Sequence, residues 1–489
     1  MTERRVVPIA KGRQVKTPRK RSKTGCRTCR ARRIKCDEAP GSCRNCTSTG
    51  RVCEGYDLHR LPIKRNQCPP IIGIGPGRSM TSDEKRGFSY FQHHLIPSLV
   101  VFFDSSLWQT SVLQMCSADP AVCHAVNMLS AIHQDAEAKG MRLAGVDLQN
   151  ARHRFALEQE TRSFALLRKR RASVDPQVRH VMLLCCLLFV MAELLLGQYA
   201  NAFAHLRSGL RVLDESRRLG LPVARGLVNA FKMLDTQSTH VGVIESVVCI
   251  DEQDDQVPDA FTSLDDAREA LGRVANGWIP FIAKCWRLSE TELMGDYETL
   301  WLERRRLLSS FEQFRPLIHQ FCERSYPKLR PKEQRGADLL RLQCLGMTIV
   351  LKTCLCDEDD PGPPTSEYID LLSAHEAFME KFPHRPTFSL EPGIIGGLYG
   401  VASKCPDLGV RCRAIKALRS WPRYEGMLNS NVAAAVAVEG LKVELRRLSG
   451  DVRDLDHSLD QRPDQSLLKA LKSTEKAGDW ALVRDVELR

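Results

Sequence analysis

Residues 26–53 read CRTCRARRIKCDEAPGSCRNCTSTGRVC, and this stretch contains six of the nineteen cysteines in the 489-residue chain. The spacing C-x2-C-x6-C occurs twice within it, and six residues join the two copies. The apolar side chains between the cysteines are Ala31, Ile34, Ala39 and Val52, which are too few to form a hydrophobic core. The pattern therefore predicts a small module that is held together by its cysteines.

Two chemistries can cross-link six clustered cysteines, namely disulfide bonds and metal coordination. A disulfide framework is typical of secreted chains, but residues 1–14 are charged and lack the apolar run of a signal peptide. Zinc is therefore favoured, because it binds four ligands in a tetrahedron and thiolate is among its commonest ligands. Two separate four-thiolate sites would need more sulfurs than the six present, so two ions would share two sulfurs. The repeat suggests that the shared sulfurs come from equivalent positions in the two copies.

The two copies of the repeat differ in charge. The basic residues of the first copy are Arg27, Arg30, Arg32, Arg33 and Lys35, whereas the second copy contains only Arg44 and Arg51. A basic helix on a rigid metal scaffold suits the major groove of DNA, where long donors reach phosphates and guanine edges. We therefore predict that the first copy contacts double-stranded DNA and that the second supports it. The alternative is a zinc module that contacts another protein and keeps its basic side chains in solvent.

Residues 24–57 resemble the fungal binuclear zinc-cluster transcription factors in the spacing of the cysteines and in the basic run after the second one. The resemblance implies two zinc ions as cofactors, with Cys26 and Cys43 bridging them. Cys29 and Cys36 would complete one site, and Cys46 and Cys53 would complete the other. It further implies a zinc-dependent, sequence-specific regulator of RNA polymerase II genes that acts in the nucleus.

The resemblance also implies how the module reads DNA. Members of this family place a helix in the major groove and often contact CGG-like triplets. The contacts come from basic residues after the second cysteine, so Arg33 is the first candidate, with Arg32 and Lys35 beside it. One departure lies between the copies: the family usually has a proline two residues before the fourth cysteine, whereas here Pro40 lies three residues before Cys43.

The basic charge of the chain lies at one end. Residues 1–65 contain 19 Lys and Arg against 5 Asp and Glu, a net charge of +14, while the whole chain carries +12. Residues 1–25 are predicted to be a disordered basic tail that serves as a nuclear import signal, a phosphate-binding arm or both. The tail residues concerned are Lys16, Arg19, Lys20, Arg21 and Lys23.

A segment rich in proline and glycine follows the cysteine module, for which we predict the bounds 26–58. Residues 59–80 contain seven prolines and glycines, which predicts a flexible linker and excludes a helix. Many family members dimerise through a coiled coil in this position, but the apolar heptads that a coiled coil needs are missing from the linker. A homodimer would therefore need an interface in the rest of the chain.

Residues 81–450 are predicted to form a large helical domain, and residues 451–489 a polar tail. Thr81 to Glu84 fit a capping box, Ser106 to Gln109 fit another, and Asp119 precedes a proline as an N-cap does. The most apolar run, residues 181–192, is shorter than the ~20 residues of a membrane span and predicts a buried central helix. Further helices are expected at about 222–240, 264–275, 300–322, 332–356, 366–381, 392–403, 408–420 and 429–448.

Four phrases in this domain resemble the regulatory domain often found behind fungal zinc clusters. They are FSYFQHHLIPSLVVFFDSSLW, DPQVRHVMLLCCLLFV, SLDDAREAL and SWPRYEGMLNS. The resemblance implies an all-helical domain that regulates and does not catalyse. We expect transcription co-regulators as partners, and we expect no membrane contact because the most apolar run is too short to span a bilayer. The usual catalytic motifs, such as G-x-S-x-G, Walker A and H-E-x-x-H, are missing from the sequence, so no enzyme is expected. The alternative function is a helical protein-interaction scaffold, or co-regulator, whose zinc cluster no longer reads DNA.

Overall fold

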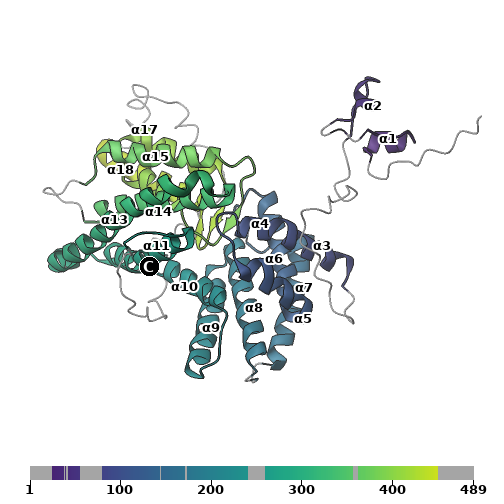
Figure 1. Ribbon diagram of the computed structural model, residues 1–489, viewed down its shortest axis with the longest axis horizontal. Helices are drawn as coiled ribbons and strands as arrows, with labels where there is room; N and C mark the ends of the chain where they lie inside the picture. Colours follow the sequence, from purple (N-terminus) through teal and green to yellow (C-terminus); the bar gives the residue numbers. More distant parts are fainter. Residues whose placement is uncertain are drawn as a thin grey trace, which may run out of the picture. The chain divides into compact units, whose positions relative to one another are not determined.

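The computed structural model describes residues 25–54, 80–240, 259–355 and 362–449, apart from residues 38, 40, 41, 144, 171, 172 and 174. The chain divides into two compact units, with the boundary between Ile71 and Ile72. The first unit contains the cysteine module and the second contains the helical domain (Figure 1). The predicted basic tail, linker and polar C-terminal tail lie outside the described residues, except for Gly25 and Met80.

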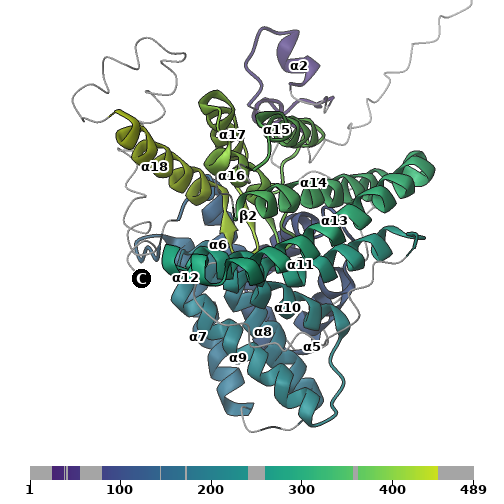
Figure 2. The same cartoon turned by 90° about the vertical axis from the view of Figure 1, so that its left-hand side faces the viewer.

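The mainly helical fold predicted for the second unit is confirmed (Figures 1 and 2). Its helices are α3 (Ser82–Tyr90), α4 (Ile96–Leu99), α5 (Val112–Ala118), α6 (Pro120–Ala138), α7 (Ala151–Arg170), α8 (Pro176–Leu195), α9 (Tyr199–Arg218), α10 (Arg225–His240), α11 (Leu264–Arg287), α12 (Glu290–Gly295), α13 (Tyr297–Ser325), α14 (Pro331–Thr353), α15 (Thr365–Glu380), α16 (Ile395–Lys404), α17 (Leu408–Ser420) and α18 (Ser430–Ser449). The largest departure from the expected bounds is at α11, which continues through Pro280 to Arg287.

Local capping signals determine where several helices begin. The Thr81 hydroxyl accepts the N–H of Glu84 at 3.2 Å, and the Glu84 carboxylate accepts the N–H of Thr81 at 2.9 Å. This is the capping box predicted for α3. The Asp119 carboxylate accepts the N–H of Ala121 at 2.8 Å and begins α6, which confirms the predicted N-cap.

The capping box predicted at Ser106 is wrong. The Ser106 side chain makes no capping hydrogen bond, and a turn of π-helix at Leu107–Ser111 follows it. The side-chain oxygen of Gln109 instead accepts the N–H of Ser105 at 2.8 Å. The side chain of Gln109 therefore bonds one residue earlier than the predicted capping box required.

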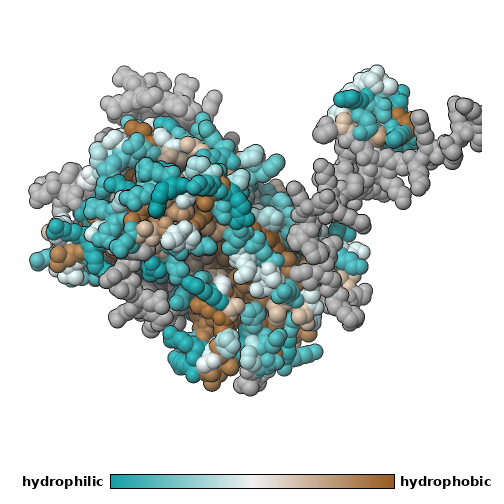
Figure 3. All heavy atoms as spheres, in the orientation of Figure 1, coloured by the Kyte–Doolittle hydropathy of each residue, from teal (hydrophilic) through white to brown (hydrophobic). Residues whose placement is uncertain are grey.

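Helix α8 is the centre of the first of two hydrophobic cores. Among the described helices it alone is long and apolar enough, by length and composition, to cross a membrane. Residues 187–195 of this helix are nevertheless buried, and the helix packs against α6, α9 and α10. On the face shown in Figure 3, hydrophilic residues cover much of the helical unit, and hydrophobic residues are exposed between them. The predicted buried central helix is therefore confirmed.

The two hydrophobic cores exchange residues. The first core is built mainly from α3 to α10, and the second mainly from α11 to α18. Phe102 and Phe103, which follow α4, nevertheless pack in the second core. In return, Phe388 and Tyr424 from the C-terminal half pack in the first core. Because each half completes the core of the other, the helical unit folds as one body.

Three short strands contribute residues to both cores. In the described part of the chain, they are where the domain departs from the predicted all-helical fold. Strand β1 (Phe388–Ser389) pairs in parallel with β2 (Tyr424–Glu425), which pairs in antiparallel fashion with β3 (Leu428–Asn429). Figure 2 shows β2 among the helices of the two halves. The phrase SWPRYEGMLNS therefore forms a hairpin that joins the cores.

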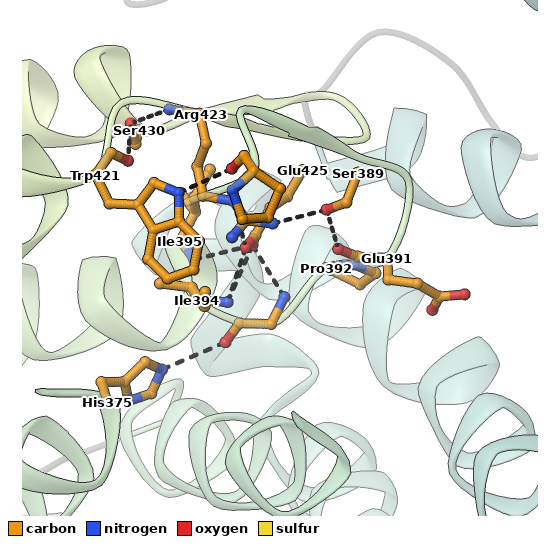
Figure 4. Close-up of polar contacts among 12 residues, drawn as sticks. His375, Ser389, Glu391, Pro392, Ile394, Ile395, Trp421, Arg423, Glu425 and Ser430 are labelled. Atoms are coloured by element: carbon orange, nitrogen blue, oxygen red, sulfur yellow. Dashed lines mark hydrogen bonds and ion pairs between the residues drawn. The ribbon is translucent and has the colours of Figure 1, made fainter. Parts of the chain in front are cut away.

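A buried ion pair anchors this hairpin to α16 (Figure 4). The Arg423 Nε atom lies 3.2 Å from Glu425 Oε1, and both side chains are fully buried. The Glu425 carboxylate also accepts the N–H groups of Gly393, Ile394 and Ile395 at 2.9–3.0 Å. These N–H groups belong to the start of α16, where the helix dipole and unpaired donors favour negative charge. Glu425 thus compensates a buried cation and caps a helix.

The Arg423 guanidinium connects the two halves of the unit. It stacks over Trp421 at 4.6 Å from the ring centroid and lies 5.8 Å from the ring centroid of Phe102. Its Nη2 donates to the Ser389 hydroxyl at 2.9 Å. Burial lowers the pKa of Arg423, and the charge of Glu425 opposes that shift. The buried cation therefore relies on this one carboxylate.

Gly426 occupies the turn between β2 and β3 with a φ of +55°. A Cβ atom there would overlap the side-chain amide of Gln237. That amide accepts the N–H of Met427 at 3.0 Å and donates to the carbonyl of Leu390 at 3.2 Å. We expect Gly426→Ala to lower the free energy of unfolding by about 2–4 kcal/mol, through left-handed strain and lost hydrogen bonds. Urea denaturation followed by helical circular dichroism would measure the loss.

Gly440→Ala is the matched control for this substitution. Gly440 lies in α18 with open space around its Cα, so a methyl group meets no neighbour. Alanine favours a helix by about 1 kcal/mol over glycine, so this variant is expected to be slightly more stable. Similar effects of the two substitutions would show that the turn does not require glycine.

Candidate metal centre and nucleic-acid interface

The two cysteine copies form the same local structure. Helix α1 (Arg27–Ala31) begins after Cys26, and helix α2 (Arg44–Thr47) begins after Cys43. In each copy the N–H of the first cysteine donates to the sulfur of the third at 3.5 Å, from Cys26 to Cys36 and from Cys43 to Cys53. The repeat in the sequence is therefore a repeat in the structure.

Sulfur atoms from both copies meet in the interior of the module. The sulfurs of Cys26, Cys29, Cys43 and Cys46 all lie within 4.8 Å of one another. Cys43 Sγ lies 3.6 Å from Cys26 Sγ and 3.5 Å from Cys29 Sγ. Cys46 Sγ lies 3.8 Å from each of the same two sulfurs. These thiols, with Cys36, form a buried cluster against which Cys53 packs.

The sulfur spacing fits zinc. A Zn–S bond of about 2.3 Å places the sulfurs of a tetrahedral site about 3.8 Å apart. The four measured separations span 3.5–3.8 Å. Burial raises the pKa of the Cys26 and Cys29 thiols, so metal binding would have to displace their protons. Among the described residues of the module, Ile34 and Val52 are exposed and the buried apolar side chains are those of cysteines.

Polar side chains tie the two copies together, and the sequence did not predict these contacts. The Thr28 hydroxyl donates to the carbonyl of Val52 at 3.2 Å and accepts the N–H of Glu54 at 3.1 Å. Asn45 Nδ2 donates to the carbonyl of Lys35 at 2.8 Å. Thr28 and Asn45 each lie two residues after the first cysteine of a copy. Aligning the copies would therefore have identified both as candidates.

Asp37, which lies outside helix α2, caps the N-terminus of that helix. Its carboxylate accepts the N–H of Arg44 at 3.1 Å and that of Asn45 at 3.5 Å. The side chain of Cys43, at the N-cap position, makes no capping hydrogen bond. An external carboxylate thus does what an N-cap side chain does elsewhere, which leaves the sulfur of Cys43 available to the cluster.

Helix α1 ends in a turn that holds Arg33 in the left-handed region, with a φ of +58°. The N–H of Arg33 donates to the carbonyl of Arg30, and the N–H of Ile34 donates to the carbonyl of Cys29, both at 3.1 Å. This pair of hydrogen bonds defines a Schellman motif, in which glycine is the usual residue at the left-handed position. A residue with a Cβ costs roughly 1–2 kcal/mol there.

The second copy makes the same turn with glycine. Gly50 is equivalent to Arg33 in the repeat, and its φ is +62°. The N–H of Arg51 donates to the carbonyl of Cys46 at 3.0 Å, as Ile34 does to Cys29 in the first copy. The first copy therefore accepts backbone strain to present an arginine where the second copy has no side chain, which points to a function for that arginine.

The other basic residues of the first copy differ in exposure. Arg27, Arg33 and Lys35 are exposed, whereas Arg30 and Arg32 are half-buried. Arg32 Nη1 donates to the carbonyl of Asn45 at 3.5 Å and to the hydroxyl of Thr49 at 3.4 Å. Arg32 thus joins the first copy to the second. The tail residues Lys16, Arg19, Lys20, Arg21 and Lys23, and Pro40 between the copies, lie outside the described residues.

Two parts of the chain match known families. Residues 24–61, which include the six clustered cysteines, match the family described as the fungal Zn(2)-Cys(6) binuclear cluster domain. Residues 86–241 match the family described as the fungal specific transcription factor domain. The second match ends with α10, whereas the helical unit continues through α18.

Curated relatives resemble different lengths of the chain. It is 22% identical to the aspercryptin biosynthesis cluster-specific transcription regulator of Emericella nidulans, over 68% of this chain and 59% of that protein. It is 25% identical to the transcription regulator lscL of Purpureocillium lilacinum, over 58% of this chain and 76% of that protein. It is 63% identical over 61 residues, 12% of each chain, to the transcriptional regulatory protein moc3 of Schizosaccharomyces pombe. No solved structure matches the chain.

Proposed function

Because the chain belongs to the fungal Zn(2)-Cys(6) binuclear cluster transcription factors, we propose that it reads a GC-rich DNA triplet in the nucleus. Its cluster holds two zinc ions, and it is a DNA-binding transcription regulator, not an enzyme. The observation that carries the proposal is the exposed Arg33, which is held in a left-handed turn where the second copy has Gly50.

We assign the two bridging sulfurs to Cys26 and Cys43. The resemblance to the fungal binuclear zinc clusters selects these two, and their contacts with the other copy agree with it: Cys26 Sγ lies 3.8 Å from Cys46 Sγ, and Cys43 Sγ lies 3.5 Å from Cys29 Sγ. Their mutual distance of 3.6 Å suits two sulfurs that share both ions. In this assignment Cys29 and Cys36 complete one site, and Cys46 and Cys53 complete the other.

We assign base contact to Arg33. Its planar guanidinium matches the O6 and N7 acceptors of guanine, and it leaves the module from the end of α1. Arg27, Arg30 and Lys35 would contact phosphates on either side of it. The hydrogen bonds of Arg32 to Asn45 and Thr49 favour a scaffold role for that residue rather than a base contact.

Selection from a random DNA duplex pool would test the function. The full-length, zinc-loaded protein is expected to enrich a short GC-rich triplet, because the side chains in the proposed groove reader are guanine donors. A chain stripped of zinc with a chelator is the control and is expected to enrich nothing. If the zinc-loaded protein also enriched nothing, the chain would be a helical scaffold whose cluster does not read DNA.

Substitutions at Arg33 would separate its chemistry from its backbone strain. Arg33→Ala is expected to weaken binding to the preferred triplet by about 1–3 kcal/mol and to relax the choice of base at one position. Arg33→Gly is expected to lose the same affinity while making the module more stable by about 1 kcal/mol, because glycine relieves the left-handed strain. Quantitative gel shifts on matched and mismatched duplexes would measure the affinities.

A matched control for Arg33 is Arg51→Ala. Arg51 lies in the second copy, directly after Gly50, and is expected to contribute only general charge. An Arg33→Ala variant that lost equal affinity for every duplex would place Arg33 on a phosphate and contradict its assignment as the base reader.

We further propose that the basic tail and the helical unit control where and when the cluster acts. The tail carries the five closely spaced lysines and arginines that an import signal needs. The helical unit is one body of two interlocked cores, which suits a surface for transcription co-regulators or for a second copy.

A further inference from the structure

Three polar side chains from different helices converge in the helical unit, away from the cysteine cluster. They are Glu160 of α7, Glu193 of α8 and His205 of α9, and their ligand atoms lie within 4.8 Å of one another. The three helices lie side by side (Figures 1 and 2). Glutamate oxygens and imidazole nitrogens are both ligands that divalent transition metals accept.

Within the part of the chain that the structure describes, the two carboxylates lack a cationic partner. Glu193 is only 8% exposed and Glu160 is half-buried. In the described part of the chain no lysine or arginine forms an ion pair with either, and neither is hydrogen-bonded to His205. Asn201 Nδ2 donates to Glu193 Oε2 at 3.3 Å. A buried acid and a half-buried acid therefore lie beside an imidazole to which neither is hydrogen-bonded. A bound cation or a shared proton would offset the repulsion between the two carboxylates.

An aromatic layer fixes the imidazole. The ring of His205 lies 5.2 Å from that of Phe189 and 5.7 Å from that of Phe164, and the two phenyl rings stack at 4.6 Å. Each phenylalanine lies four residues from a glutamate of its own helix, so one face of each helix presents an apolar ring beside an acid. Phe189 is buried and Phe164 is 39% exposed, so the rings form an apolar wall on one side of the polar cluster. An apolar wall of this kind is common beside metal ions in proteins.

We propose that Glu160, Glu193 and His205 bind one divalent transition-metal ion, Zn²⁺ or Mn²⁺, at a site separate from the cysteine cluster. Ligand atoms about 2.0–2.2 Å from a shared ion lie at most ~4.4 Å apart, so small side-chain rotations close the observed spacing. Asn201 would orient the Glu193 carboxylate as an outer partner. The ion would tie α7 to α8 and α9 within the residues that match the fungal specific transcription factor domain.

The competing explanation is that the two glutamates share a proton. Burial raises the pKa of both carboxyl groups, and Glu160 adds to the shift at Glu193. A proton-sharing pair needs no imidazole and no metal. The two explanations therefore differ in whether His205 is required and in whether an ion binds at all.

Metal titration of the full-length protein, with zinc already in its cysteine cluster, would distinguish them. Mn²⁺ is a suitable probe because thiolates prefer zinc, so the cluster keeps its own ions. Loss of the free Mn²⁺ signal in electron paramagnetic resonance is expected to show one bound ion per chain. Zinc counting after equilibration with Zn²⁺ is the second readout, and it is expected to give one ion beyond those of the cluster.

The variants Glu193→Gln and His205→Phe are expected to bind the added ion at least about tenfold more weakly. Phenylalanine preserves the stacked rings, and unchanged helical circular dichroism would show that the fold is retained. Glu158→Gln, an exposed acid on α7, is the matched control and is expected to bind as the wild type does. Binding of neither metal by the wild type, or equal binding by His205→Phe, would overturn the site in favour of a shared proton.

Discussion

Replacing Cys43 by serine is expected to remove both zinc ions and to unfold the cysteine module. The Cys43 sulfur lies 3.5 Å from that of Cys29 and 3.6 Å from that of Cys26, at the meeting point of the two copies. Because we assign this sulfur to both ions, its loss would leave each ion with three ligands. Structural zinc contributes about 10–16 kcal/mol of apparent folding free energy. The described residues of this module bury cysteines rather than a hydrophobic core that could replace it. Binding to DNA should be lost with the metal.

Zinc counting by native mass spectrometry would measure this effect on the full-length chain. Cys53→Ser removes a sulfur that we place on one ion only, so it is expected to retain one zinc. Cys412→Ser, at a half-buried cysteine of the helical unit, is the control and is expected to retain both zinc ions of the cysteine cluster. A Cys43→Ser protein that still carried two zinc ions would show that its sulfur does not bridge them.

The metal chemistry could be predicted from the sequence because its signal is local. Six cysteines in two equal copies leave few arrangements, and the charge of each copy predicts which copy contacts DNA. The strain at Arg33 was equally within reach, since aligning the copies sets it against Gly50. The comparison with Gly50 distinguishes Arg33 from the other basic residues, because an arginine in a left-handed turn lowers the stability of the module.

The interlocked cores could not be predicted because no local pattern encodes them. The strands are two residues long, too short to show alternation, and Phe388 pairs with Tyr424 from 36 residues away. Phe102 and Phe103 follow helices of the first core in the sequence, and only the tertiary packing shows that they belong to the second core. Glu160, Glu193 and His205 likewise have no spacing motif, because each comes from a different helix.

Replacing Glu425 by glutamine is expected to destabilise the helical unit by about 3–5 kcal/mol, because it leaves the buried Arg423 charge without its counter-ion. The variant keeps the size of the side chain and one oxygen for the N–H groups that begin α16. The loss of stability in Glu425→Gln would therefore come mainly from the missing charge and not from a cavity. Urea denaturation of the full-length chain, followed by helical circular dichroism, would give the free energy of unfolding.

Glu376→Gln is the matched control, because it breaks an Arg–Glu pair with Arg413 in which both side chains are well exposed. Such pairs contribute about 0–1 kcal/mol, since water already solvates both charges. The double variant Arg423→Met, Glu425→Gln removes both buried charges and is expected to recover part of the stability that Glu425→Gln alone loses. If Glu425→Gln cost no more than Glu376→Gln, or if the double variant recovered nothing, the buried charge pair would not be what joins the hairpin to the second core.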